Sequence, residues 1–241
     1  IMFGTVDSYL IYNLTKEKNH LTDITNASRT SLFNIEKEEW DGELLKLFDI
    51  PIQMLPRVCD CDADFGTISV GSQEVKITGV IGDQQSALVG QRCFSSGQMK
   101  STFGTGCFLM VNTKDNILYV KEGLLSTVGY KLRGETSYAI EGSIYSCGNI
   151  VKWLRDKMQF FDEVSESEEM IKLKKELSTT FFLPGFNGLG APYWDSNVRG
   201  GYYGITQDTS KEDMVTAAFQ SICFQVKDQL FLFSSNLSFG R

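Results

Sequence analysis

Asp83 is the residue whose type and position are best suited to chemistry, in the segment Gly82-Asp83-Gln84-Gln85. It follows residues 75–81, a β-branched run that predicts a buried-type strand, and open α/β sheets bind ligands beyond such strand ends. A carboxylate there can act as a general base, with the Gln84 amide beside it as donor and acceptor. The alternative is an aspartate that caps a helix beginning near Ser86.

A second candidate site is the glycine turn Gly104-Thr105-Gly106. Because glycine lacks a side chain, the backbone N–H groups of such a turn can approach a phosphate closely, and the Thr105 hydroxyl adds a donor. The flanking runs, residues 99–103 and 107–111, predict that the turn closes a β-hairpin. A purely structural hairpin is the alternative interpretation, and the turn alone does not decide between them.

The sequence gives little support for a site built from histidine or cysteine side chains. The single histidine, His20, lies in a polar run, so triads and metal sites that require an imidazole are disfavoured. Of the six cysteines, only Cys59 and Cys61 lie close together in the sequence. These spacings favour reduced thiols over a metal site or a disulfide framework.

Composition indicates a globular protein and excludes several classes of partner. The chain has 241 residues, of which 42% are hydrophobic and 12% aromatic, enough for a packed core. A net charge of −7 with 23 lysines and arginines argues against a nucleic-acid partner. No apolar run approaches the roughly 20 residues of a membrane span, and residues 1–5 lack the basic-then-apolar order of a signal peptide. A cytoplasmic location is therefore expected.

The elements that must position these residues alternate between helices and strands. A short helix is predicted from Asp41 to Phe48, because Leu44, Leu45 and Phe48 fall on one side of it. It is expected to end at Asp49-Ile50, since the residue before Pro51 disfavours helix. Another short helix, from Ser86 to Gly90, follows the candidate base. A second hairpin pairs residues 124–130 with residues 137–140. Strands and helices that alternate in this way, with interspersed hairpins, predict an α/β fold.

Two longer helices carry apolar stripes. One is predicted from Ser143 to Phe160, because apolar residues recur there at spacings of three and four: Ile144, Cys147, Val151, Leu154 and Met158. The other begins at Ser210 with a start that resembles a capping box and carries its stripe to Phe233. Both stripes are interpreted as ordinary core.

Several motifs follow one another in a fixed order along nearly the whole chain. They are Phe3-Gly4-Thr5-Val6-Asp7, Thr25-Asn26-Ala27-Ser28-Arg29-Thr30, Leu32-Phe33-Asn34-Ile35, Gly82-Asp83-Gln84-Gln85, Gly104-Thr105-Gly106-Cys107-Phe108, Trp153-Leu154-Arg155-Asp156 and Gly188-Leu189-Gly190-Ala191-Pro192-Tyr193-Trp194. A further spaced set comprises Gly200, Tyr202, Gly204, Ile205, Asp213, Met214, Ala217, Ala218, Phe219 and Gln220. In the order and the residues of these motifs, the chain resembles the FGGY carbohydrate kinases and, within that family, the glycerol kinases.

The resemblance implies an α/β fold of the actin-like, sugar-kinase ATPase kind, which is ribonuclease H-like, with two incomplete lobes. Residues 1–90 would be the C-terminal part of the substrate domain, and residues 91–241 the N-terminal part of the nucleotide domain. Members of the family are longer than this chain at both ends. The chain is therefore expected to be a central fragment.

The resemblance also implies roles for individual residues. Asp83 would bind glycerol and take the proton from its terminal hydroxyl, Gln84 would hydrogen-bond glycerol, and Phe108 would pack on its carbon skeleton. Four residues would contact the nucleotide in the cleft between the domains: Gly104 and Thr105 in a phosphate turn, Gly148 beside it, and Lys152 where relatives often have glutamine.

The implied activity is ATP-dependent phosphorylation of glycerol to sn-glycerol 3-phosphate in glycerol catabolism. ATP and Mg²⁺ would be the cofactors, and a full-length parent could form a homo-oligomer. The family's Mg²⁺-binding phosphate hairpin is not found in this chain, so the isolated chain is expected to be inactive. Two alternatives stay open, namely a noncatalytic remnant of such a kinase and a different FGGY sugar kinase.

Overall fold

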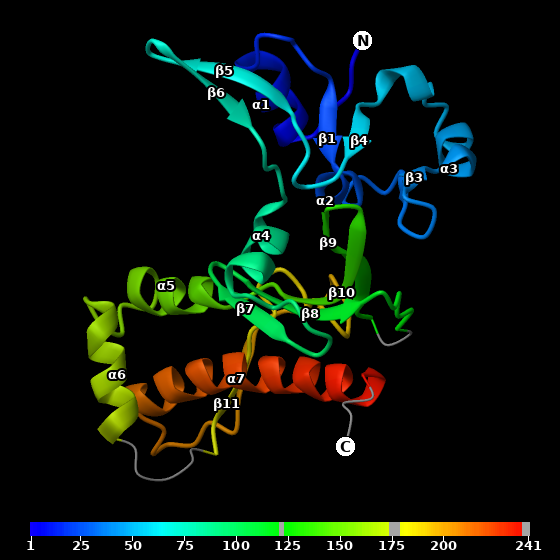
Figure 1. Ribbon diagram of the computed structural model, residues 1–241. Coiled ribbons are helices and arrows are strands. Elements are labelled where there is room, and N and C mark those ends of the chain that lie inside the picture. Colours follow the sequence, from blue (N-terminus) through cyan, green and yellow to red (C-terminus); the bar gives the residue numbers. More distant parts are fainter. Residues whose placement is uncertain (121–122, 174–178, 238–241) are drawn as a thin grey trace. The chain divides into compact units, whose positions relative to one another are not determined.

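The computed structural model describes residues 1–120, 123–173 and 179–237 (Figure 1). They form two compact units. The first unit comprises Ile1–Lys100, Met110–Tyr119 and Ser126–Ile140, and the second comprises Ser101–Leu109, Val120–Leu125 and Glu141–Arg241. Each unit has its own apolar core. Buried side chains that include Ile24, Leu88 and Val128 fill the first, and a set that includes Ile150, Leu154 and Val215 fills the second.

The first unit consists of short elements. In chain order they are α1 (Val6–Leu14), β1 (Leu21–Asp23), α2 (Ile24–Ala27), β2 (Phe33–Asn34), β3 (Glu39–Trp40), α3 (Gly42–Leu47), the 3₁₀ turn η1 (Ile52–Met54), β4 (Arg57–Cys59), β5 (Gly66–Val70), β6 (Gln73–Ile77) and α4 (Asp83–Gly90). Strands β1 and β4 pair in parallel, whereas β2–β3 and β5–β6 are antiparallel hairpins. The predicted helix at 41–48 is confirmed as α3, whose first N–H groups donate to the Asp41 side chain.

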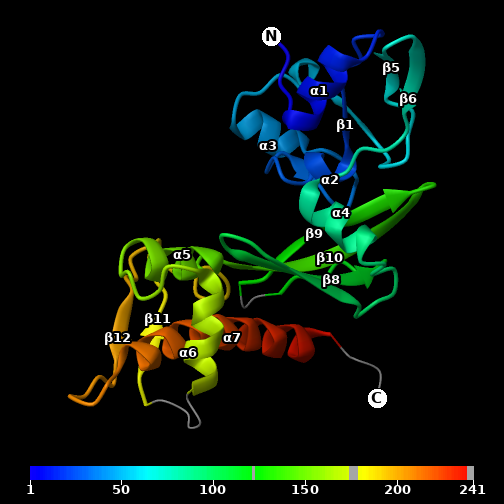
Figure 2. The ribbon, with the colours of Figure 1, turned by 90° about the vertical axis from the view of Figure 1, so that its left-hand side faces the viewer.

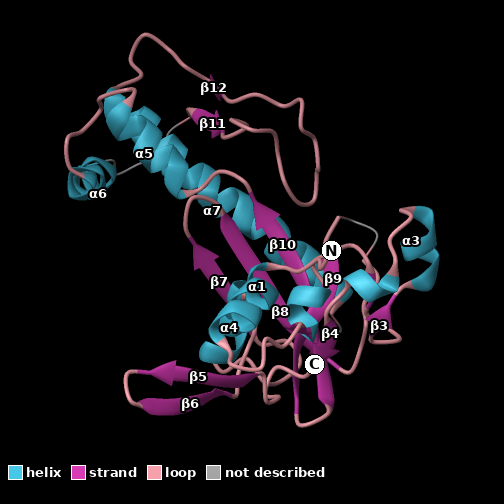
Figure 3. Cartoon of the chain, turned by 90° about the horizontal axis from the view of Figure 1, so that it is seen from above, coloured by secondary structure: helices cyan, strands magenta, loops and turns pink. Residues whose placement is uncertain are grey.

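A four-stranded sheet follows, with strand order β7-β8-β10-β9 (Figure 3). Its strands are β7 (Met99–Phe103), β8 (Cys107–Lys114), β9 (Leu125–Leu132) and β10 (Glu135–Ile144). Both predicted hairpins are confirmed, because β7 pairs with β8 and β9 pairs with β10. The glycine turn therefore sits between two paired strands.

The second unit is built around its longest helix (Figure 2). Its remaining elements are α5 (Gly148–Asp156), α6 (Val164–Leu173), β11 (Phe181–Leu183), β12 (Gly201–Tyr203) and α7 (Lys211–Asn236). Helix α7 contacts α5, α6 and β11. The predicted start of α7 is confirmed, since Ser210 and Asp213 form a reciprocal capping box. Val215, Ala218 and Phe233 of its stripe are buried.

The predicted strand at 75–81 is wrong in extent and in burial. Strand β6 ends at Ile77 and pairs only with β5, so its side chains are mostly exposed. Beyond Ile77 the chain leaves the hairpin, and the Val80 N–H donates to the Cys61 carbonyl at 2.9 Å. The β-branched run is continuous in sequence, but among the described residues no strand pairs with its second half. Asp83 thus follows a short connection instead of a buried strand.

The predicted helix at 143–160 is wrong at both ends. Strand β10 continues through Ile144, and α5 begins only at Gly148 and ends at Asp156. Cys147 has φ −140° and ψ −94°, outside the helical region, and it separates the two elements. The apolar spacing that suggested one helix combines the end of a strand with the buried face of a helix. The short helix predicted at 86–90 also starts earlier, at Asp83.

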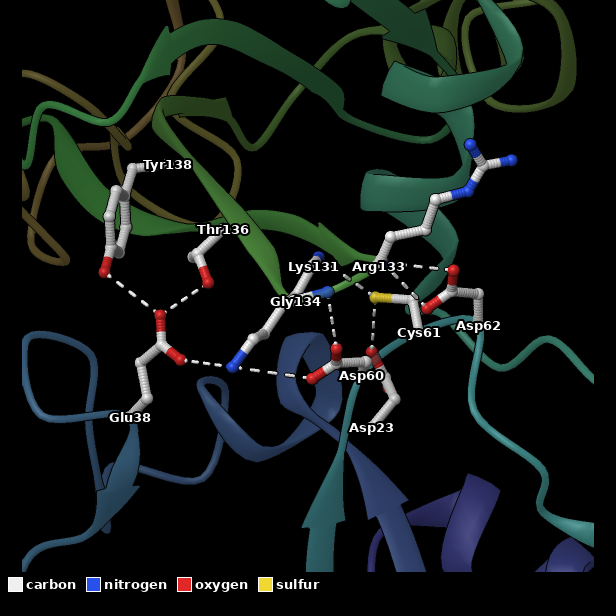
Figure 4. A network of polar contacts seen from close by, with 10 residues as sticks. All are labelled: Asp23, Glu38, Asp60, Cys61, Asp62, Lys131, Arg133, Gly134, Thr136 and Tyr138. Atoms are coloured by element: carbon white, nitrogen blue, oxygen red, sulfur yellow. Dashed lines mark hydrogen bonds and ion pairs between the residues drawn. The ribbon is translucent and has the colours of Figure 1, made fainter.

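In the first unit, a network of hydrogen bonds and ion pairs connects the β9–β10 hairpin to the loops that follow β2 and β4 (Figure 4). The Lys131 Nζ lies 2.6 Å from the Glu38 carboxylate and 3.4 Å from that of Asp60. Burial opposes ionisation of Glu38, but hydrogen bonds from Lys131 and Thr136 outweigh it and hold the pKa of this carboxyl below its ordinary value. The hydrogen bond to Glu38 correspondingly raises the pKa of Lys131.

We expect Lys131→Met to lower the free energy of unfolding by about 1–2 kcal/mol, because a charged hydrogen bond in a partly buried network is lost. Since the folded pKa of Glu38 is lowered, its contribution is present above its unfolded pKa and is lost as pH falls through the folded value. The difference between wild type and variant should thus be largest near neutral pH and shrink in acid. Urea unfolding at several pH values measures it.

Lys76→Met is the matched control, because the Lys76–Asp64 pair is exposed on both sides. Exposed ion pairs contribute little, so this variant should match the wild type. Equal losses in the two variants would contradict the assigned role of the network.

Candidate functional site

Asp83 and Gln84 are the first two residues of α4. Asp83 is exposed, and its Oδ1 accepts a hydrogen bond from the Gln84 N–H at 2.7 Å. The Gln84 Nε2 lies 3.5 Å from the Asp83 Oδ2, so the two side chains face each other. The N-cap position belongs to Gly82. Asp83 is therefore not the cap of a helix that begins near Ser86, and it lies instead in the first turn, where a carboxylate interacts favourably with the helix dipole.

A buried relay holds the start of α4. The Gly82 N–H donates to the Thr25 Oγ1 at 2.8 Å, and that hydroxyl donates to the Asp23 Oδ2 at 2.5 Å. Asp23 is fully buried and also caps α2 by accepting from the Thr25 and Asn26 N–H groups. Sequence reasoning did not single out Asp23 or assign Thr25 a role. The only local signal is an aspartate two residues before a threonine at the start of a short helix.

Thr25→Val should lower the free energy of unfolding by about 1–3 kcal/mol, since it leaves the Gly82 N–H and the Asp23 carboxylate without this buried partner. Thr25→Ser keeps the hydroxyl and should recover most of the loss. Chemical unfolding of the three proteins compares them directly. If the valine and serine variants were equally stable, the hydroxyl would not hold the helix start.

A groove of about 750 Å³ runs beside Asp83 in the first unit. Its polar side chains are Asp7, Asn26 and Asp83, and its apolar wall includes Leu10 and Val80. The Asp7 carboxylate accepts hydrogen bonds from the hydroxyls of Thr5 and Thr22. The groove can take a small polar molecule next to the Asp83 carboxylate.

The glycine turn of the second unit packs against the start of α5. The Gly148 N–H donates to the Gly104 carbonyl at 2.9 Å, and the Cys147 N–H donates to the Thr105 carbonyl at 3.0 Å. Both hydrogen bonds are accepted by carbonyl oxygens of the turn. Unpaired carbonyl oxygens would repel an anion. Gly104 and Thr105 are exposed. The Gly104 N–H donates to the Gly106 carbonyl at 2.8 Å, so an anionic ligand would approach the turn at the exposed Thr105.

Close packing explains why glycine stands at two of these positions. A Cβ added to Gly148 would lie 2.5 Å from the Gly104 carbonyl oxygen. One added to Gly106 would lie 2.4 Å from the Ile144 carbonyl oxygen. Both distances are far below a normal carbon–oxygen contact, and both neighbours are backbone atoms that cannot turn away.

The structure brings some of the predicted site residues together and leaves others apart. Asp83 and Gln84 are adjacent in the first unit, while Gly104, Thr105 and Gly148 meet in the second. Lys152 is exposed on α5, four residues after Gly148, so both lie on one face of the helix. Phe108 is partly buried on β8. The predicted residues thus form two separate groups, one in each unit, which we call half-sites.

Two thiols close to these half-sites, those of Cys147 and Cys61, have a raised pKa. All six cysteines are free. Burial is the main cause that raises the pKa of Cys147 to about 11, and it raises that of Cys61, beside Asp23, still further. At neutral pH these groups are protonated and are poor nucleophiles or metal ligands.

The described residues contain no cluster of metal-ligating side chains. No group of three or more histidine, cysteine, aspartate or glutamate side chains within residues 1–120, 123–173 and 179–237 could hold a metal ion. Asp83 shares its groove with one other carboxylate, that of Asp7. In that same part of the chain, no helix has the length and apolarity needed to cross a membrane.

Known proteins match the chain along almost all of its length. Residues 2–90 match the N-terminal domain of the FGGY family of carbohydrate kinases, and residues 99–236 match its C-terminal domain. A glycerol kinase of Alteromonas mediterranea is 52% identical over 230 residues, which are 95% of this chain and 47% of the relative. Glycerol kinase 1 of Pseudomonas aeruginosa is 48% identical with the same coverage. The chain thus spans about half the length of the curated relatives it matches.

Solved structures match it as well. The crystal structure of Plasmodium falciparum glycerol kinase with ADP aligns with a TM-score of 0.89 and 37% identity, over 98% of this chain and 47% of that one. Gluconate kinase from Lactobacillus acidophilus aligns with a TM-score of 0.85 over 98% of this chain and 49% of that one. At 23% identity, this second likeness concerns the fold alone.

Proposed function

Because the chain belongs to the FGGY family of carbohydrate kinases, we propose that it is the central part of an enzyme that phosphorylates glycerol to sn-glycerol 3-phosphate with ATP. The family match also confirms the predicted α/β fold of the sugar-kinase kind. Residues 1–90 are proposed to belong to the substrate domain and residues 91–241 to the nucleotide domain. The proposed location is the cytoplasm, where ATP and glycerol are both available.

The observation that carries the proposal is the Asp83–Gln84 pair at the open start of α4. Asp83 would accept the proton of the reacting glycerol hydroxyl, and the Gln84 amide would hydrogen-bond the same molecule. An exposed carboxylate is suited to this task because it is reachable by substrate. Phe108 is proposed to contact the carbon skeleton. The identity to proteins named glycerol kinase supports glycerol as the substrate.

The second half-site is proposed to bind the nucleotide. Phosphoryl transfer depends mainly on positioning and on stabilisation of the charge on the transferred group. The Gly104–Gly106 turn would contact a phosphate through its backbone, and Thr105 would add its hydroxyl. Gly148 keeps the turn close to α5, and Lys152 supplies a positive charge on the same helix. Mg²⁺ is proposed as the metal cofactor of the whole enzyme, and no step is assigned to it.

A chimeric kinase tests this function. This chain would replace the matching 230 residues of the Alteromonas mediterranea glycerol kinase, and ADP release would be measured with glycerol, xylulose and gluconate. We expect ATP-dependent phosphorylation of glycerol. A chimera that folds and binds ADP but phosphorylates none of them would support the noncatalytic remnant. A preference for xylulose or gluconate would support another sugar kinase.

A further inference from the structure

A buried lysine, Lys100, contacts the side-chain amide of Gln84, the candidate substrate-binding group. Lys100 lies on β7, and only 4% of its surface is exposed. Its Nζ donates a hydrogen bond to the Gln84 Oε1. Both residues belong to the first unit. The ammonium group thus lies against the first turn of α4, and its burial keeps it from direct contact with a ligand.

This contact decides which way the Gln84 amide faces. A glutamine side chain has an acceptor oxygen and a donor nitrogen that can exchange places by a half turn. An ammonium group can only donate, so the oxygen must face Lys100. The Nε2 then faces away from Lys100, and it lies 3.5 Å from the Asp83 Oδ2.

We propose that Lys100 is a positioning residue that locks the Gln84 amide with its N–H group toward the hydroxyl held by Asp83. The proposal rests on the proposed function of this half-site. With the opposite amide orientation, the Gln84 oxygen would compete with Asp83 as acceptor for the hydroxyl proton. Lys100 removes that competition without touching the substrate.

The chemistry needs this orientation. During transfer the hydroxyl proton goes to Asp83, the hydroxyl oxygen bonds to the γ-phosphorus of ATP, and the bond from phosphorus to the ADP oxygen breaks. An N–H donor beside the attacking oxygen orients it and stabilises the negative charge that develops there. Gln84 and Lys100 keep their own protons throughout.

The first test measures the orientation in the 241-residue chain and needs no catalysis. Side-chain amide signals of Gln84 would be recorded by nuclear magnetic resonance in wild type, Lys100→Met and Lys100→Arg. Loss of the donor should shift the Gln84 signals, while arginine, which can still donate, should keep them near the wild-type position. The amide of Gln229, which donates to the Ala191 carbonyl at 3.2 Å in the second unit, is the internal control. Unchanged Gln84 signals in Lys100→Met would overturn the proposal.

The second test uses the chimera. Lys100→Met should lower kcat and raise KM for glycerol by a combined factor of about 10–100, below the 10²–10³-fold typical of losing a whole charge-stabilising donor. KM for ATP should stay unchanged, and Lys100→Arg should restore most of the activity. Lys172→Met, which removes an exposed ion pair on α6, is the matched control. Equal changes in KM for both substrates, without rescue by arginine, would assign Lys100 a structural role only.

Gln84→Glu provides a second test that does not depend on whether Lys100→Met folds. Gln84→Glu retains an acceptor for Lys100, so the buried pair is kept, but it has no N–H group. We expect it to fold and to lose glycerol turnover at least as strongly as Lys100→Met. Full turnover in this variant would overturn the proposal. An inactive chimera would refute the proposed function, whereas the spectroscopic test of Lys100 would still stand by itself.

Discussion

Asp83→Asn is expected to abolish turnover in the chimera while ATP binding stays nearly unchanged. The substitution keeps the size of the side chain and its hydrogen-bonding reach, but it removes the proton acceptor. General-base catalysis typically contributes about 10²–10⁴-fold to the rate, so kcat should fall by that factor. Steady-state kinetics with glycerol gives kcat, and calorimetric titration with ATP gives the affinity.

The stability of the variant should remain close to that of the wild type. Asp83 is exposed and accepts one local hydrogen bond, from the Gln84 N–H, which an asparagine oxygen can also accept. Loss of its charge at the start of α4 removes only a weak interaction with the helix dipole. A strong fall in kcat with an unchanged unfolding transition therefore reports chemistry and not folding.

Thr105→Ala is the contrasting variant. The backbone groups of the turn remain in place, so we expect a smaller loss that is shared between ATP affinity and kcat. If Asp83→Asn retained more than about a tenth of wild-type turnover, the loss would lie below the range of a general base. Asp83 would then be only a residue that stabilises the first turn of α4.

The predictable parts of the structure are those fixed by local chemistry. The turn at Gly104–Gly106 lies between two apolar runs, and such an arrangement has few alternatives to a hairpin. Ser210 and Asp213 satisfy each other's backbone donors within four residues, so the start of α7 could be placed to the residue. The short helix beside Asp83 is also predicted, although it starts at Asp83 and not at Ser86.

The missed parts depend on partners that are distant in sequence. Whether residues 75–81 form a buried strand depends on a neighbour strand, which β5 supplies only up to Ile77. The stripe at 143–160 could not reveal that its first residue belongs to β10. The contacts that hold the half-site are also nonlocal, since Gly82 is 57 residues from Thr25 and Gln84 is 16 from Lys100. No pattern in a single sequence identifies such pairs.

Gly148→Ala is the second substitution for which we expect a large effect. The added Cβ would lie 2.5 Å from the Gly104 carbonyl oxygen, and the Gly148 N–H donates to this same oxygen at 2.9 Å. The clash can be relieved only if the turn moves away from α5, which also stretches that hydrogen bond. Such overpacking typically costs about 1–3 kcal/mol of stability.

The functional consequence should exceed the loss of stability, because the turn that moves is the proposed phosphate site. A displacement of about 1 Å at a reacting group can lower the rate by about 10²-fold. In the chimera, KM for ATP should therefore rise and kcat fall, while KM for glycerol changes little, since Asp83 and Gln84 lie on α4. Gly42→Ala in α3 is the matched control, because nothing lies within 4 Å of its added Cβ. Unchanged ATP kinetics in Gly148→Ala would mean that the close approach of α5 to the turn plays no part in nucleotide binding.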